Sequence, residues 1–166
     1  VNRKARETEA IRGLREMLPE CDRKDLRAET GRHYSPYWQG LPTSAHATFA
    51  ELLREIDDVE VRIDLTQDID RDATRAAFAM ADHPGSFARL AGALALVSAN
   101  VVDARSYTTK DGYVTAAFWI QDADGRPFEE ARLPRLRKMI ERTLAGEVIA
   151  REALADRAKL KKRERD

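Results

Sequence analysis

Apolar and polar residues alternate along two short stretches of the chain, Val101–Thr108 and Tyr113–Gln121, and this pattern is typical of β-strands that are half buried. In a third stretch, Ala73–Met80, the residues Ala76, Phe78 and Met80 mark one face of a strand. The tripeptide Lys110-Asp111-Gly112 joins the two alternating stretches, and Asp-Gly accepts the positive φ angles of a tight hairpin turn. We therefore expect these two stretches to form an antiparallel hairpin.

Two other stretches have apolar residues at helical spacing. Phe87, Leu90, Ala91, Leu94 and Ala95 form one stripe within a helix expected over Ser86–Ser98, and Leu133, Leu136, Ile140 and Leu144 form another within Phe128–Leu144. The order strand, helix, strand, strand, helix predicts an α+β fold. It is the ferredoxin-like βαββαβ arrangement, a two-layer sandwich with an antiparallel sheet, short of its last strand.

The missing strand has a candidate upstream. Val59–Leu65 alternates apolar and charged residues, and a short polar run separates it from Ala73–Met80, so the two stretches can pair as an antiparallel hairpin. A ferredoxin-like sheet places its fourth strand antiparallel to its first. We therefore expect Val59–Leu65 to occupy the place of the fourth strand.

The first 58 residues have a helical pattern. Ile11, Leu14 and Leu18 form a short apolar stripe that Pro19 ends, and Phe49, Leu52, Leu53 and Ile56 form a better one after Ser44, a plausible N-cap. Between these stripes, Tyr34–Pro42 is interrupted by Pro and Gly, and we expect its aromatic residues to anchor it. Residues 147–166 carry many basic residues and few apolar ones, which predicts a solvated helix or linker.

Composition agrees with one modest domain and an appended segment, since 43% of the 166 residues are hydrophobic. A single cysteine, Cys21, excludes an internal disulfide, and no apolar run approaches the roughly 20 residues that span a bilayer. These features favour the cytoplasm. Val1–Arg6 resembles neither a start-codon terminus nor a signal peptide, so we expect the chain to be excised from a longer protein.

The strongest candidate binding feature is the turn Asp82–Gly85. Pro84 fixes its own φ angle and Gly85 permits a close approach of the backbone. Free amides at the first turn of the following helix would favour a carboxylate or another anionic group. The alternative is that Pro-Gly merely connects a strand to a helix.

No residue of the chain is predicted to be catalytic or to bind a metal. Asp68-Ile69-Asp70-Arg71-Asp72 opens like a calcium loop, but Ala73 and Ala79 stand where Gly and Glu are needed, so a solvated turn is expected. A nucleotidyltransferase would place Gly-Ser before its Asp-x-Asp, whereas Gly85-Ser86 comes after. The remaining candidates lack a catalytic or metal-binding pattern, since the histidines are scattered and the cysteine has acidic neighbours. They are His33, His46, His83 and Cys21.

Five motifs in register carry a resemblance to a known family. They are Arg71-Asp72-Ala73-Thr74, Asp82-His83-Pro84-Gly85, Ala99–Ala104, Thr108–Gly112 and Phe118–Asp122. Together they resemble the first ACT domain, a small-molecule sensor module, of bacterial bifunctional uridylyltransferase/uridylyl-removing enzymes. His33–Leu41 is similar to the segment that this family places between its hydrolase domain and that ACT domain. The resemblance divides the chain into a helical connector (1–58), an ACT domain (59–146) and a charged helix or linker toward a second ACT domain (147–166).

The resemblance also implies a function. It implies that the domain senses glutamine and thereby controls uridylylation of the PII signal protein, while both catalytic activities, and the magnesium they use, belong upstream of Val1. No cofactor is expected in this chain, and the N-terminal helices would pack on a catalytic domain. Pairing with another ACT domain or a second copy is expected. The implied ligand-binding residues are Asp82, His83, Pro84, Gly85, Ser86, Asn100 and Val101.

Two alternatives stay open beside this interpretation. One is an architectural ACT module that dimerises without a ligand. The other is a nucleic-acid-binding domain on the same scaffold, which would need aromatic residues for base stacking on the sheet. Phe118 and Trp119 are adjacent and so face opposite sides, and 29 basic residues balance 29 acidic ones, which argues against this alternative.

Overall fold

The computed structural model describes residues 2–146 and residue 159. The elements, in chain order, are α1 (Arg3–Met17), α2 (Arg23–Gly31), α3 (Ser35–Gly40), α4 (Thr43–Leu53), β1 (Val61–Asp68), β2 (Ala73–Ala81), α5 (Ser86–Leu96), β3 (Asn100–Thr108), β4 (Tyr113–Gln121) and the 3-10 turn η1 (Glu130–Arg132). A helix over residues 133–146 follows η1. The charged helix or linker predicted for 147–166 lies outside the described residues, apart from Lys159. The domain boundaries stay predictions.

The four strands form one antiparallel sheet in the order β1-β2-β4-β3. β1 pairs with β2 from Val61 opposite Met80 to Asp68 opposite Ala73. The prediction that this upstream segment takes the place of the fourth strand is confirmed, although the strand starts two residues later than expected and continues to Asp68. The fold is therefore α+β and ferredoxin-like, as the order of apolar patterns indicated.

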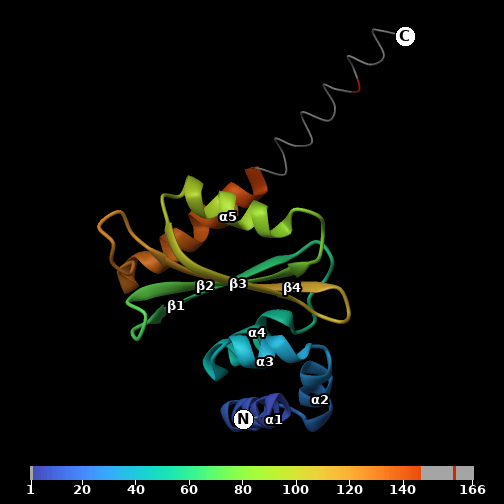
Figure 1. The fold of residues 1–166 in the computed structure, drawn as a ribbon. Helices are drawn as coiled ribbons and strands as arrows, with labels where there is room; N and C mark the ends of the chain where they lie inside the picture. Colours follow the sequence, from blue (N-terminus) through green and yellow to red (C-terminus); the bar gives the residue numbers. More distant parts are fainter. Residues whose placement is uncertain (1, 147–158, 160–166) are drawn as a thin grey trace.

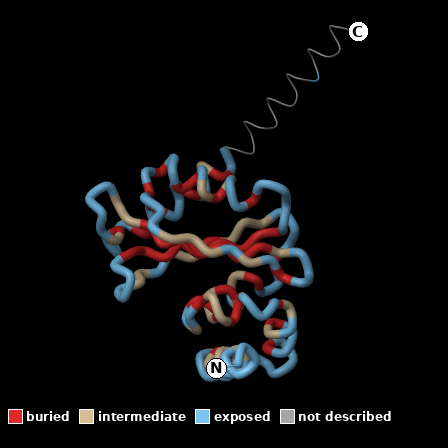
Figure 2. Tube along the Cα trace, in the orientation of Figure 1, coloured by how far each residue is buried: buried red, intermediate tan, exposed pale blue. Residues whose placement is uncertain are grey.

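Helices cover both faces of this sheet. α5 and the helix over 133–146 lie on one face, and α1 to α4 lie on the other (Figure 1). β2 is buried at every position and β4 at every position between its two ends, as the burial colours of Figure 2 show. The expected two-layer sandwich therefore gains a third layer from the helical segment, and the expectation that β4 is half buried is wrong.

The core on the α5 side of the sheet is mainly aliphatic, with three phenylalanines. Leu90 and Leu94 of α5 are fully buried in one cluster with Phe78 of β2 and Phe118 of β4, as the helical spacing predicted. Ile140, from the helix over 133–146, is buried in the same cluster. We call this cluster the α5-side core.

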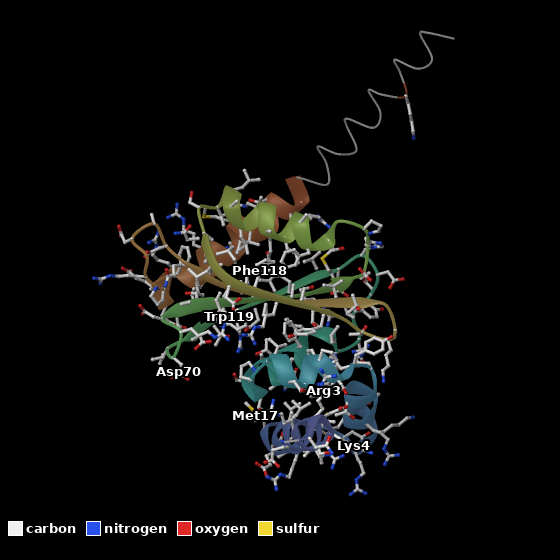
Figure 3. All side chains as sticks on the ribbon, viewed as in Figure 1. Arg3, Lys4, Met17, Asp70, Phe118 and Trp119 are labelled. Atoms are coloured by element: carbon white, nitrogen blue, oxygen red, sulfur yellow. The ribbon has the colours of Figure 1, made fainter. Side chains whose placement is uncertain are left out.

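The core on the other side, the α4-side core, contains Tyr37, Trp38 and Trp119. On the sheet, Ala77 and Ala117 supply small side chains to it, which lets the helices approach closely. Figure 3 shows Phe118 and Trp119 on opposite sides of β4. The N-terminal helices were expected to pack on a catalytic domain. Here α3 and α4 pack on the sheet of their own chain, and α1 packs on α3 and α4.

Element ends differ from the sequence predictions in small ways. α4 begins at Thr43 after Pro42, so Ser44 is not its N-cap, and the Ser44 hydroxyl instead lies 3.2 Å from the Arg75 guanidinium. α5 ends at Leu96, because Ser98 adopts a left-handed φ of 62° that stops a helix. α1 ends at Met17, before Pro19, as predicted.

Candidate functional site

The predicted binding turn, Asp82–Gly85, connects β2 to α5 and is exposed. Gly85 adopts a left-handed φ of 80°, and a side chain added there would meet no atom within 4 Å. The buried Ser86 closes the turn, because its hydroxyl donates to the His83 carbonyl at 2.7 Å and accepts from the His83 amide at 3.1 Å. The turn is thus preformed and its backbone open to solvent.

The first turn of α5 leaves backbone donors available. The Ser86 amide donates to the His83 carbonyl and the Arg89 amide to the Gly85 carbonyl. Within the part of the chain that the structure describes, the amides of Phe87 and Ala88 meet no acceptor. α5 has 11 residues, and its dipole adds partial positive charge at this end. The geometry is compatible with an anionic group, and binding at this turn stays a prediction.

Asn100 and Val101, the other half of the predicted site, lie at the opposite end of the sheet. Asn100 begins β3 opposite Gln121, whereas the Asp82 amide donates to the Gly112 carbonyl at 2.9 Å, beside the start of β4. Seven or eight strand residues at ~3.3 Å each separate the two ends by about 25 Å. One copy of the chain therefore does not bring these two halves together, because α5 carries the chain back to the end where β2 began.

β3 is an edge strand whose outer side is open. It pairs with β4 alone among the described residues, and Val101 and Val102 are 42% and 52% exposed. A bulge between Val101 and Asp103 interrupts its register. An exposed edge with apolar side chains is a surface on which another strand can pair.

A cluster that sequence analysis missed lies between α3, α4 and the sheet. We call it the histidine–aromatic cluster, made of His33, Tyr37, Trp38 and His46. His33 stacks on Tyr37 with ring centroids 3.7 Å apart, and its Nε2 lies 2.6 Å from a Glu29 carboxylate oxygen. Glu29, His33 and Tyr37 are spaced four residues apart, a signal that could have revealed the cluster.

Burial dominates the electrostatics of this cluster. It lowers the pKa of His46 to about 4, against a partly compensating hydrogen bond between Nε2 and the Tyr37 carbonyl at 2.9 Å. It also raises the pKa of Tyr37 well above its usual value. His33 and His46 are both buried, so of the two expectations for them, structural or exposed, exposure is wrong. Four buried polar atoms of this cluster have no partner among the described residues: His33 Nδ1, Tyr37 OH, Trp38 Nε1 and His46 Nδ1.

Side chains of β3 contact this cluster directly. The Tyr107 ring packs edge-on against Tyr37 at 5.8 Å between centroids, and the Arg105 guanidinium donates to the Gly40 carbonyl. A Cβ built at Gly40 would lie 2.8 Å from Cζ of Tyr107 and would overlap the hydroxyl. A side chain at position 40 would therefore have to displace the end of the Tyr107 side chain from this contact between α3 and β3.

Two aspartates at the acidic turn after β1, Asp68 and Asp70, have different surroundings. Asp70 is exposed, as expected for a solvated turn. Asp68 departs from that expectation, because one of its carboxylate oxygens accepts a hydrogen bond from Trp119 Nε1 at 2.8 Å. The Arg71 guanidinium lies 3.9 Å from the Trp119 ring centroid. Asp68 therefore secures a buried side chain of the α4-side core.

Comparison with known proteins gives strong matches over nearly the whole chain. It is 68% identical to a "Bifunctional uridylyltransferase/uridylyl-removing enzyme" of Cereibacter sphaeroides over 164 residues, which cover 99% of this chain and 18% of that protein. A protein of the same name from Ruegeria pomeroyi is 60% identical over 171 residues, covering 99% of the chain and 19% of that protein. One from Gluconobacter oxydans is 35% identical over 147 residues, 87% of the chain and 15% of the relative. No protein-family model matches.

The chain is a homologue of one segment of the bifunctional uridylyltransferase/uridylyl-removing enzymes. It spans about a fifth of the length of these relatives, so most of each relative lies outside the matched segment. The family resemblance seen in the five motifs is thereby confirmed.

Within residues 2–146, no group of three or more His, Cys, Asp or Glu side chains could hold a metal. Burial, together with Asp25, raises the pKa of the Cys21 thiol, which does not activate it as a nucleophile. No helix in the described part of the chain is both long enough and apolar enough to cross a membrane. Phe118 and Trp119 are buried on opposite faces, so neither ring is available to stack on a base.

Proposed function

We propose that this chain is the regulatory ACT module of a bifunctional uridylyltransferase/uridylyl-removing enzyme of the cytoplasm, and that it senses glutamine to control uridylylation of PII. The supporting observation is the 68% identity over nearly the whole chain to an enzyme of that name, combined with a ferredoxin-like fold. Catalysis, and the magnesium that nucleotidyl transfer uses, would reside in the parts of the enzyme beyond this segment.

In this proposal the glutamine site forms between two ACT modules. Antiparallel pairing of two β3 edges about a twofold axis would put Asn100 of one copy beside the Thr108 end of the other, near the Asp82–Gly85 turn. This arrangement would also cover the exposed Val101 and Val102. The separation of the two half-sites within one copy supports it, because a single glutamine is far shorter than about 25 Å.

Each half-site has a role in recognising the amino acid. The amides of Phe87 and Ala88 would bind the α-carboxylate, and Asp82 would bind the ammonium group. Asn100 from the second copy would bind the side-chain amide, which separates glutamine from glutamate. Val101 and the turn residues His83, Pro84 and Ser86 would shape the surface around the ligand.

The signal would leave the site through β3. Arg105 and Tyr107 contact α3, so a change in β3 on ligand binding would reach the helical segment at Gly40. A ligand shifts an equilibrium only through different affinities for two states. In the proposed mechanism, glutamine favours the state in which β3 edges are paired.

The direct test is calorimetric titration of the chain with glutamine, with glutamate as the comparison ligand. We expect glutamine to bind and glutamate to bind more weakly. Gly85→Val should abolish binding, whereas Gly125→Val, which carries similar strain at a φ of 74° in another turn, should retain it. Dimerisation without any glutamine binding would instead support the architectural alternative.

A mixing experiment tests whether the site is shared. Gly85→Val and Asn100→Ala homodimers should each bind glutamine poorly. A mixed dimer would carry both substitutions in one of its two sites and neither in the other. Mixing should therefore restore glutamine binding at one site in each mixed dimer. No restoration after subunit exchange would contradict a shared site.

A further inference from the structure

A groove of about 890 Å³ lies between the α1–α2 turn, α2 and the end of α4. Apolar side chains contribute to its lining: Leu26 and Leu53 are buried, and Met17 is 49% exposed at the edge. Figure 3 shows Met17 at the end of α1, away from the sheet. The groove therefore offers apolar contact to a side chain that enters it.

Carboxylates dominate the rim of this groove. Glu20, Asp22, Asp25, Glu51 and Glu55 line it, and none of them forms an ion pair with another residue in the described ranges. Two further acids there, Glu29 at 3.1 Å and Asp111 at 2.6 Å, pair with Arg32, whose single positive charge balances one of them. Arg54 also lines the groove, and its positive charge balances one further carboxylate in the total. The rim keeps an excess of negative charge beside apolar contact surface, which is complementary to a basic segment with an apolar residue.

We propose that this groove is the docking site for the basic segment 157–165 of a second copy of the chain. In that segment, Leu160 is flanked by six basic residues and one acidic residue. These are Arg157, Lys159, Lys161, Lys162, Arg163, Glu164 and Arg165. Leu160 enters the apolar part of the groove, and its basic neighbours pair with the rim. The inference does not rest on glutamine sensing.

The position of the groove favours a second copy over the same chain. The helix over 133–146 lies on the α5 side of the sheet, whereas the groove belongs to the helices on the opposite side (Figure 1). Only ten residues, 147–156, separate this helix from the basic segment, and fully extended they span about 33 Å. Crossing from one helical layer past the sheet to the other takes about 20 Å of that length at ~10 Å a layer, and the path must also pass around the edge of the sheet. Reciprocal exchange between two copies avoids this path and closes a twofold dimer.

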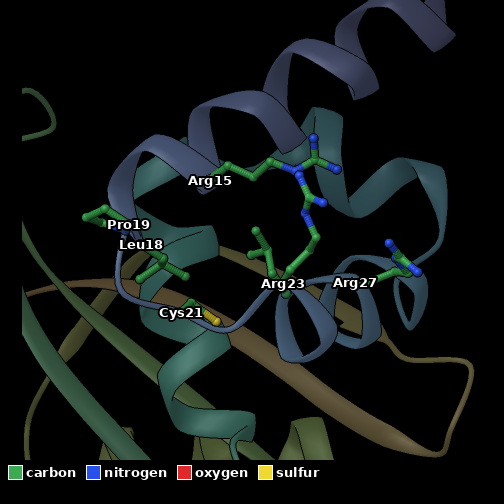
Figure 4. A pocket seen from close by; sticks show the side chains of 7 residues that line it. Arg15, Leu18, Pro19, Cys21, Arg23 and Arg27 are labelled. Atoms are coloured by element: carbon green, nitrogen blue, oxygen red, sulfur yellow. The ribbon is translucent and has the colours of Figure 1, made fainter.

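A second pocket fixes the direction in which the segment lies. On the other side of the α1–α2 turn, Arg15, Arg23 and Arg27 line a pocket of about 390 Å³ (Figure 4). None of the three has an ion-pair partner among the residues that the structure describes. Glu152 and Asp156 precede the basic segment in sequence. They lie toward this arginine pocket when residues 157–165 occupy the acidic groove.

The single cysteine makes the docking directly measurable. Cys21 is exposed and lines both pockets, so a photo-crosslinker attached to it reports on the occupant of the groove. An equal mixture of ¹⁴N- and ¹⁵N-labelled full chains is irradiated, and crosslinked peptides are identified by mass. We expect crosslinks from Cys21 to residues 157–165 that join light and heavy chains, and a several-fold loss of them in 1 M salt. Crosslinks within one chain only, or none to this segment, would overturn the proposal.

A charge exchange separates docking from other self-association, including pairing of β3 edges. Glu51→Lys with Glu55→Lys should reduce these crosslinks at least fivefold, and so should Lys161→Glu with Lys162→Glu. Mixing the two double variants should restore the crosslinks in both directions, because the basic groove of one variant meets the acidic segment of the other, and the two unaltered partners also meet each other. Glu141→Lys, an exposed carboxylate on the helix over 133–146, is the matched control and should leave them unchanged. Failure of the mixture to restore crosslinking, with circular dichroism intact, would contradict the proposal.

Discussion

The two cores of this molecule share the strands β2 and β4 but differ in chemistry. The α5-side core contains Leu90, Leu94 and Ile140 against Phe78 and Phe118, all of them apolar side chains. The α4-side core surrounds aromatic rings and imidazoles, several of whose polar atoms are buried without a partner in the described structure. A buried polar atom without a hydrogen bond costs roughly 1–3 kcal/mol. The α5-side core should therefore contribute most of the free energy of unfolding. The α4-side core should account for most of the dependence of that free energy on pH and on close contacts.

The largest expected effect is on the α5-side core. Leu94→Ala should lower the free energy of unfolding by about 2–5 kcal/mol, because a fully buried leucine leaves a cavity. Both tryptophans, Trp38 and Trp119, lie in the α4-side core, so their fluorescence reports that core while circular dichroism reports the whole fold. Because the cores share two strands, both signals should move together in urea. Separate midpoints would show that the α4-side core unfolds on its own.

Acid should weaken the α4-side core through His46. Its pKa is lowered from 6.5 to about 4, so the folded state favours the neutral ring. The stability that this ring contributes is fully present above pH 6.5 and is lost as the pH falls through about 4. Its loss amounts to about 3 kcal/mol. Urea unfolding at pH 7 and pH 4 should differ more in the wild type than in His46→Gln. An equal difference in both would mean that other groups carry the acid sensitivity.

Gly40 tests the contact between the α4-side core and β3. Gly40→Ala should cost about 1–3 kcal/mol, because the new methyl group would overlap Tyr107. Tyr107→Ala should be less costly in the Gly40→Ala background than in the wild type, since it removes the overlap. A double-mutant cycle by chemical denaturation measures this coupling. Strict additivity would contradict the close packing of α3 against β3.

The smallest expected effect distinguishes two aspartates of one turn. Asp68→Ala should cost about 1–2 kcal/mol, since it leaves Trp119 Nε1 buried without its acceptor. Asp70→Ala should change stability by less than about 0.5 kcal/mol, because Asp70 is exposed. Thermal unfolding of both variants makes the comparison. Equal effects would place Asp68 in a solvated turn, as its sequence alone suggested.

The sequence by itself predicted the ferredoxin-like order of elements, the β1–β2 hairpin and the buried face of α5. Each of these features depends on local periodicity or on short connections, and both can be recognised in the order of residues along the chain. The five motifs likewise indicated the family before any fold was known. The turn Asp82–Gly85 was predicted as a preformed anion-binding feature, and its geometry is compatible with that prediction because it depends only on neighbours in sequence.

The tertiary structure alone decided how the helical segment is placed. Arg75 of β2 reads as solvent-exposed, yet it is buried under α4, where Ser44 and Thr48 hydroxyls lie 3.2 and 3.1 Å from its guanidinium. The small residues Ala77 and Ala117 gave no strong apolar signal for a second buried face. The separation of Asp82 from Asn100 likewise follows from chain direction through the sheet. Periodicity indicates which positions of the sequence are apolar. These contacts depend instead on which distant segment packs against a given strand, and the packing of the whole chain determines that.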